Sequence, residues 1–75
     1  MRKYSKENAE IGARVRAIRQ GAGLTQEQFS ERIAVTATYI SELERGLVGI
    51  SASTVKRICL TFGVSCDQII LGLSH

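Results

Sequence analysis

The sequence predicts an all-α domain built from five short helices. Apolar residues recur three and four positions apart, as in Ile11, Val15 and Ile18, which is the spacing of one buried helix face. A serine or threonine able to cap a helix precedes four of these stretches, and a glycine able to stop a helix follows four of them. No stretch shows the apolar–polar alternation of a half-buried strand.

The first two helices are predicted on either side of a short turn that contains glycine. The stretch "SKENAEIGARVRAIRQ" forms the first apolar stripe, and Gly21 is expected to stop that helix. Thr25 opens the second helix, because Gln28 lies three residues on and completes a capping box. Leu24 and Phe29 have the spacing of a hydrophobic staple around the same cap, so three local signals agree on this start.

The third helix is predicted from Thr36 to Arg45, with Ile40 and Leu43 on its buried side. Only about three residues, 34–36, connect it to the second helix. A connection this short is typical of a helix-turn-helix and also of a plain αα-hairpin. Spacing alone leaves both interpretations open.

The fourth helix is expected to begin after Ser51 and to end at Gly63, and the short fifth helix to run from Ser65 to near Gly72. The apolar side of the fourth helix consists of Val55, Ile58, Cys59 and Phe62. Together these patterns describe a single domain over residues 1–75.

The length, composition and net charge of the chain exclude several classes of protein. A chain of 75 residues holds one small domain, and 44% hydrophobic residues without proline is a folded composition. No apolar run is long enough to span a membrane and no signal peptide is visible, so we expect a cytoplasmic protein. The net charge of +3 suits a polyanionic partner but is mild.

The sequence contains no pattern that predicts an enzyme, a metal site, a cofactor or a small-molecule ligand. The one histidine is His75 at the terminus, and no nucleophile–base pair or phosphate-binding loop is visible. Two cysteines, Cys59 and Cys66, are too few for a structural zinc site. We expect them to be reduced thiols that pack as small apolar residues.

The stretch "LTQEQFSERIAVTATYISELERG" resembles the helix-turn-helix of the lambda-repressor and Cro family of DNA-binding regulators. "LTQ" at 24–26, "YIS" at 39–41 and "ERG" at 44–46 stand where that family places such residues. "LTFGVSCDQIILG" at 60–72 resembles its junction between the fourth and fifth helices. The resemblance covers residues 9–72, and the motifs are specific because they occur together in register.

The resemblance implies a compact five-helix DNA-binding domain with the helix-turn-helix at helices 2 and 3. Residues 9–72 would form its core, residues 1–5 a flexible basic arm and residues 73–75 a tail. It implies a sequence-specific transcriptional regulator that binds an inverted repeat in double-stranded DNA as a homodimer, with the helix at 36–45 in the major groove.

Position-by-position transfer from the family gives three sets of expected site residues. The base-reading set is Gln26, Ala37, Thr38, Ser41 and Glu42. The phosphate-facing set is Arg19, Thr25, Thr36, Tyr39 and Lys56. The dimer set is Ile50, Val64, Cys66, Ile70 and Leu73.

Arg19 and Glu44 match a pair that in this family joins the first helix to the recognition helix. One interpretation is a structural ion pair that braces the two helices. The other is that Glu44 orients Arg19 toward a phosphate. We favour the brace, with a phosphate contact in addition.

Three features depart from the family's pattern. Ala34 stands where the family places glycine in the turn, which costs about 1 kcal/mol if the backbone there is left-handed. The apolar loop "LVGI" at 47–50 replaces a polar one, and it either packs locally over the core or joins a dimer interface. Residues 24–46 contain four glutamates and two arginines, whereas residues 1–23 contain six cations and two glutamates.

Two other functions remain open from the sequence. The same fold serves antitoxin-like autoregulators, and it can persist as a protein-interaction module that no longer binds DNA. The sequence does not distinguish a repressor from an activator, nor a phage, mobile-element or restriction-controller context.

Overall fold

The computed structural model describes residues 4–73 and confirms the all-α fold class. Within that range the chain forms five helices and no strand. Most of the predicted basic arm, and His75, lie outside the described residues. The helices are α1 (Lys6–Gly21), α2 (Gln26–Arg32), α3 (Ala37–Glu44), α4 (Ala52–Phe62) and α5 (Cys66–Ile70).

Each helix begins at a hydroxyl side chain. In all five cases the hydroxyl oxygen accepts the backbone N–H of the third residue beyond it at 3.1 Å. At Thr25 the predicted capping box is complete, because the Gln28 side-chain oxygen accepts the Thr25 N–H at 2.9 Å. A hydroxyl cap of this kind stabilises a helix start by about 1 kcal/mol. The capping residues are Ser5, Thr25, Thr36, Ser51 and Ser65.

Helix α1 ends at Gly21 as predicted, but Gly21 is not the residue that takes the left-handed conformation. Gly21 is the last helical residue, and the N–H of Ala22 still bonds back to the carbonyls of Ile18 and Arg19. The left-handed turn comes at Gly23, with φ of 71°. With two glycines in the segment, the sequence did not show which of them takes the left-handed conformation.

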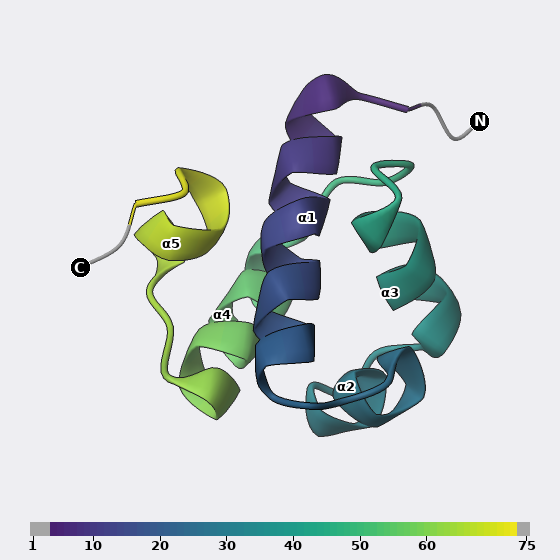
Figure 1. Ribbon diagram of the computed structural model, residues 1–75, viewed down its shortest axis with the longest axis vertical. Helices are drawn as coiled ribbons and strands as arrows, with labels where there is room; N and C mark the ends of the chain where they lie inside the picture. The colour runs from purple at the N-terminus through teal and green to yellow at the C-terminus, as the bar shows by residue number, and fades with distance from the viewer. Residues whose placement is uncertain (1–3, 74–75) are drawn as a thin grey trace.

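Helix α1 stands at the centre of the fold (Figure 1), with α2 and α3 on one side and α4 and α5 on the other. All five helices contribute to one apolar core. The Phe29 and Phe62 rings stack in it with their centroids 5.0 Å apart, joining α2 to α4. The buried apolar residues are Ile11, Val15, Phe29, Ile33, Ile40, Leu43, Val55, Ile58 and Ile69.

Helices α1 and α3 approach each other so closely that two glycines are needed. A Cβ added at Gly12 would overlap the carbonyl oxygen of Leu43 and would lie 3.0 Å from the Cα of Glu44. A Cβ added at Gly46, where φ is 77°, would lie 2.9 Å from the Cα of Ala9. The first half of α1 therefore rests directly on the backbone at the end of α3.

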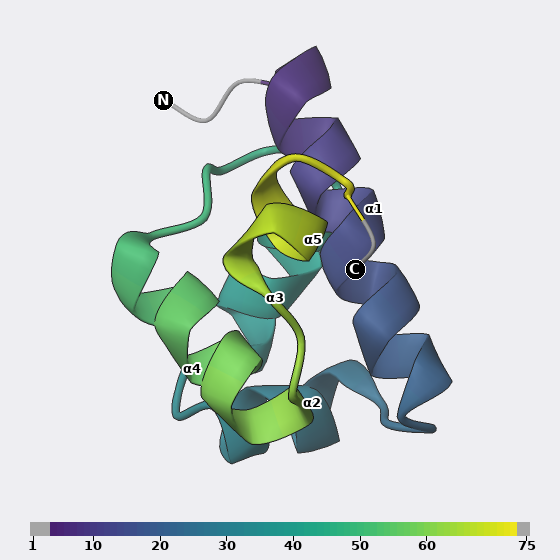
Figure 2. The same cartoon turned by 90° about the vertical axis from the view of Figure 1, so that its left-hand side faces the viewer.

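The short helix α5 is attached through one buried side chain and one arginine. Ile69 is its buried residue, and the Arg14 guanidinium on α1 donates to the carbonyls of Ile69 and Ile70 at 3.2 and 2.9 Å. Figure 2, viewed from this side, shows α5 lying between α1 and α4. None of the described helices is both long and apolar enough to cross a membrane.

The loop at 47–50 packs locally. Val48 and Ile50 are partly buried against the core. The Tyr39 hydroxyl holds the end of the loop, since it accepts the Ser51 N–H at 3.2 Å and donates to the Gly49 carbonyl at 3.5 Å. Val48 and Ile50 therefore pack as the local-cap interpretation expects.

We predict that Gly12→Ala destabilises the domain by about 2 kcal/mol or more, because the added methyl group forces α1 away from the α3 backbone. The free energy of unfolding, measured by urea titration, checks this value.

Gly21→Ala is the matched control on the same helix, because nothing lies within 4 Å of its added Cβ. We expect this variant to be neutral or more stable by about 0.5 kcal/mol. Equal destabilisation by both substitutions would contradict the close-approach explanation.

Candidate nucleic-acid interface

The turn between α2 and α3 is short and contains a strained residue. Ala34 has φ of 57°, and it is the one non-glycine residue with positive φ in the described range 4–73. The Arg57 guanidinium on α4 donates to the carbonyls of Ile33 and Ala34, both at 3.3 Å. Ala34 thus adopts the left-handed backbone angle that was considered from the sequence. Arg57 from α4 holds this strained turn in place through its two hydrogen bonds.

The outer face of α3 lies opposite its buried residues Ile40 and Leu43. Thr38 is exposed there. The other three base-reading candidates on this helix are half-buried: Ala37, Ser41 and Glu42. The structure therefore places these four predicted residues on one short helix whose opposite side is fixed in the core.

Arg45 is absent from the predicted site residues, but it lies next to this face. It is exposed, and its N–H bonds to the carbonyl of Ser41 at 3.2 Å, so it continues the helical turn. Residues four apart on a helix are surface neighbours. Counting i+4 from Ser41 and i+7 from Thr38 would have identified this cation from the sequence.

The hydroxyls of Thr25 and Thr36 are exposed at the starts of α2 and α3. Each accepts one backbone N–H as a cap. A hydroxyl that accepts a bond keeps its own proton to donate. Both residues can therefore cap a helix and donate to a phosphate oxygen at the same time.

Glu44 is the centre of a buried polar network that joins α1, α2 and α3. Arg19 donates to its two carboxylate oxygens from Nε at 2.7 Å and from Nη2 at 3.0 Å. The Gln26 amide donates to the same carboxylate at 3.1 Å, and Arg19 Nη1 donates to the Leu24 carbonyl at 2.9 Å. The side chains of Arg19 and Glu44 are only 12% and 4% exposed, so we call this pair the Arg19–Glu44 brace.

Arg19 keeps its charge over the whole neutral range. The hydrogen bond to Glu44 raises the pKa of Arg19 above its ordinary value, burial partly opposes this rise, and the charge of Glu44 adds to it. A raised pKa on a cation means that its stabilisation is lost only as the pH rises through that value. Titration of Arg19 therefore does not change the stability of the domain near neutrality.

Three of the expected site residues either bond within the fold or lie away from the outer face of α3. The Gln26 amide nitrogen donates one of its two N–H groups to Glu44, which leaves its oxygen and its second N–H available to a base. The Tyr39 hydroxyl is bonded to the loop at 47–50 and to Ser51. Lys56 is exposed on α4, where it lines a groove between α4 and α5.

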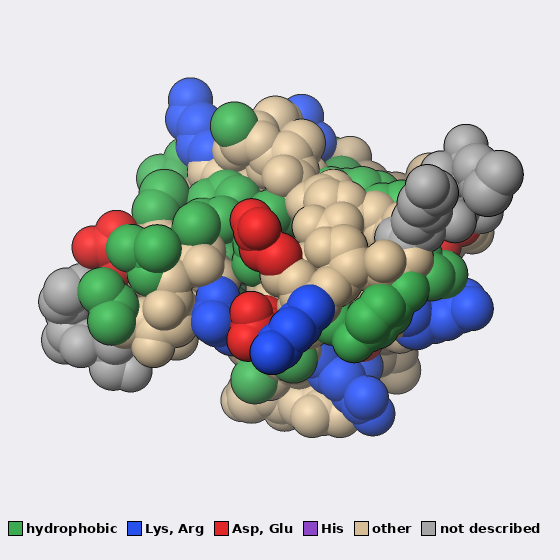
Figure 3. Space-filling view, turned by 90° about the horizontal axis from the view of Figure 1, so that it is seen from above, with side chains coloured by type: hydrophobic (Ala, Val, Ile, Leu, Met, Phe, Trp, Pro, Cys, Tyr) green, Lys and Arg blue, Asp and Glu red, His purple; other side chains and the backbone are tan. Residues whose placement is uncertain are grey.

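Three of the arginines in the described part of the chain form hydrogen bonds within the fold. Arg14, Arg19 and Arg57 all hold carbonyls or the Glu44 carboxylate. Viewed from the end where α1 begins (Figure 3), the visible lysine and arginine side chains are spaced apart and do not form one patch. On this face, attraction to a polyanion would therefore come from separate cations.

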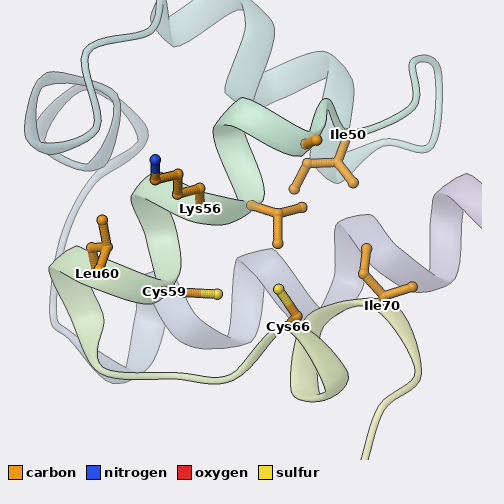
Figure 4. A pocket seen from close by; sticks show the side chains of 8 residues that line it. Ile50, Lys56, Cys59, Leu60, Cys66 and Ile70 are labelled. Carbon is orange, nitrogen blue, oxygen red and sulfur yellow. The ribbon is translucent and has the colours of Figure 1, made fainter.

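A groove of about 510 Å³ lies between α4 and α5 (Figure 4). Its walls are almost entirely apolar, and three of the five expected dimer residues line it: Ile50, Cys66 and Ile70. Val64 instead packs against the core, and Leu73 lies beyond α5 and is 49% exposed. Within residues 4–73, no three side chains of His, Cys, Asp or Glu gather as metal ligands would.

Comparison with known proteins supports one family. A family model described as "Helix-turn-helix" matches residues 15–69, which is more than half of the chain. The chain is 34% identical over 62 residues to the uncharacterized HTH-type transcriptional regulator YazB of Bacillus subtilis, and the match covers 81% of this chain and 90% of that protein. It is 30% identical over 60 residues to the immunity repressor protein of Bacillus phage phi105, covering 80% of this chain and 42% of the repressor.

The fold is also that of solved regulators. The clp gene regulator ClgR from C. glutamicum superposes with a TM-score of 0.77 at 28% identity, covering 89% of this chain and 87% of that one. Not every relative has the same length, since the chain spans only 13% of a propionyl-CoA carboxylase regulator from Cereibacter sphaeroides. The shared part is therefore the helical domain itself.

We predict that Arg19→Ala lowers the free energy of unfolding by about 3 kcal/mol in the absence of DNA, because it leaves the buried Glu44 carboxylate without a cationic partner. Thermal and urea unfolding of the free protein measure this loss.

The control is Arg16→Ala, which removes an exposed arginine from the same helix and should change stability by no more than about 0.5 kcal/mol. An unchanged melting temperature in Arg19→Ala would mean that the pair does not brace the helices.

Proposed function

Because this chain belongs to the helix-turn-helix family of transcriptional regulators, we propose that it binds an inverted-repeat operator as a homodimer, with α3 in the major groove. The observation that supports this most directly is the outer face of α3. Thr38 and Ser41 lie there, their side chains make no hydrogen bond within the described chain, and core packing does not require them. Polar side chains held in this way on a rigid helix are suited to base recognition.

The chemistry of this face suits direct readout. The methyl groups of Thr38 and Ala37 can contact the methyl group of thymine, and the Ser41 hydroxyl can donate or accept. Glu42 can accept from the amine of cytosine and repels phosphate, so it mainly penalises wrong sequences. The Gln26 oxygen supplies one further acceptor at the start of α2.

Phosphate contacts would come from groups around this face. Thr25 and Thr36 have hydroxyl protons to donate, and Arg45 adds an exposed charge at the end of α3. Arg19 contributes mainly through the position of α3, because its guanidinium nitrogens already have partners within the fold. So few phosphate contacts give one subunit modest affinity, which favours a dimer on two half-sites.

The α4–α5 groove is the surface that we assign to dimer contacts. It is lined by Ile50, Cys66 and Ile70, and Leu60 beside them is 76% exposed. Apolar side chains gathered around a groove mark partner surfaces in small proteins. A small core also gains stability from such an association.

We predict that binding-site selection from random duplexes yields an inverted repeat whose half-sites lie about 34 Å apart. Mobility shifts against competitor DNA measure the preference. Equal affinity for the selected site and for competitor, across moderate salt concentrations, would reject the proposed function.

Two variants separate base reading from phosphate contact. Thr38→Ala should reduce discrimination at one base pair by about 1 kcal/mol. Arg45→Ala should weaken binding to all sequences alike and lower the salt slope by about 1. If both variants weakened all sequences equally, the outer face of α3 would not be the reading surface.

We predict that Ile70→Glu shifts the protein to monomer at concentrations where the unmodified chain is a dimer, because it places a charge in the groove. Sedimentation equilibrium measures the change. Thr61→Glu is the control, since Thr61 is exposed on α4, which forms the other wall of the groove, but does not itself line it. Equal association of both variants would place the dimer contacts elsewhere.

A further inference from the structure

The two cysteines face each other across the α4–α5 groove. Cys59 is half-buried on α4, Cys66 is exposed as the first residue of α5, and both are free thiols. Both line the groove, and Figure 4 shows their sulfur atoms pointing toward one another. The chain reverses between them through the left-handed turn at Gly63, which brings together two residues on separate helices.

The two thiols differ in how they meet solvent. Burial raises the pKa of the Cys59 thiol, and contact with the Cys66 thiol raises it further. A thiol with a raised pKa contains little thiolate near neutrality and reacts slowly with an oxidant. Cys66 is exposed, so it is the thiol that a reagent in solution reaches first.

Helix α5 is held unevenly along its length. Arg14 and Ile69 fasten its C-terminal half, whereas its first residue, Cys66, is exposed at the groove. A helix of only five residues is not stable without such attachments. A covalent bond at Cys66 would therefore add a direct link between the first residue of α5 and α4.

We propose that Cys59 and Cys66 are a redox modification site at which low-molecular-weight disulfides produce an intramolecular disulfide that fixes α5 on α4. In the first step the Cys66 thiolate attacks one sulfur of the external disulfide, forms a mixed disulfide and releases one external thiolate. In the second step the Cys59 thiolate attacks the Cys66 sulfur and releases the second external thiol. Two protein thiols are oxidised, one external disulfide is reduced, and excess thiol reverses the reaction.

The disulfide also changes the groove to which we assigned the second copy, and this consequence rests on the proposed function. Two thiols in contact are separated by the radii of both sulfurs, whereas a disulfide bond is about 2.05 Å long. Its formation draws the start of α5 toward α4. Interface cores are packed as densely as protein interiors, so we expect the oxidised protein to dimerise about tenfold more weakly.

The bond itself is tested by mass spectrometry of the protein treated with glutathione disulfide. The unmodified chain should lose two hydrogens and retain no glutathione, and digestion should yield a peptide pair linked through Cys59 and Cys66. Cys59→Ser should retain one glutathione on Cys66, because no second thiol can displace it. The Cys66→Ser variant should react much more slowly with glutathione disulfide, because only the half-buried Cys59 thiol remains. This substitution should not disturb the fold, since Cys66 is exposed. A stable glutathione adduct on the unmodified chain, or disulfides between chains, would overturn the proposal.

The effect on dimerisation is tested by sedimentation of reduced and oxidised protein, with the double variant Cys59→Ser, Cys66→Ser as control. The proposal requires weaker association of the oxidised chain and no response in the double variant. Equal association in both redox states would reject the control of dimerisation. If the reduced chain did not associate at all, the proposed dimer would fail and its redox control with it, whereas the mass measurement would still decide the disulfide.

Discussion

The close crossing of α1 over the end of α3 is the constraint on which the other features of the domain depend. Two glycines, Gly12 and Gly46, let the backbones meet, and the Arg19–Glu44 brace joins the same two helices further along α1. Glu44 also accepts from Gln26, so the position of α2 is set by the same carboxylate. One contact region thus orients both helices of the helix-turn-helix relative to the centre of the fold.

The basic residues show how a small domain can divide its charge between structure and binding. Arg14 holds the end of α5, and Arg57 holds the strained turn before α3. A chain of 75 residues can build only a small apolar core, and the hydrogen bonds of these arginines add to the contacts that hold its helices together. The formal charge of +3 therefore does not measure attraction to DNA, because part of the positive charge satisfies carbonyl groups inside the fold.

Local signals in the sequence were sufficient to predict the fold class and most helix boundaries. A hydroxyl cap such as Thr25 or Ser51 depends on residues three positions away, and such short-range chemistry can be read directly. The close approach at Gly12 could not be predicted, because the atom it meets is on Leu43, 31 positions later in the chain. The same holds for Arg57 at the turn and for the pairing of the two thiols, which depend on how α4 is placed.

The candidate site was predictable only to the level of which helix face is outward. The spacing of Ile40 and Leu43 placed Thr38 and Ser41 outside, and the resemblance to a family supplied their roles. That Gln26 is bonded to Glu44, and Tyr39 to the loop, depends on rotamers and distances that spacing does not encode.

In α3, the residues that hold the helix in the fold and the residues proposed to read bases lie on different sides. This arrangement affects how proteins of this kind diversify. Ile40, Leu43 and Glu44 secure the helix from one side, whereas the Thr38 and Ser41 side chains contribute no bond to the fold. Substitutions at Thr38 and Ser41 thus remove no side-chain hydrogen bond from the described fold. A duplicated copy could acquire a new operator through a few such changes while its scaffold stayed unaltered, so divergence of DNA targets would be fast and divergence of the domain slow.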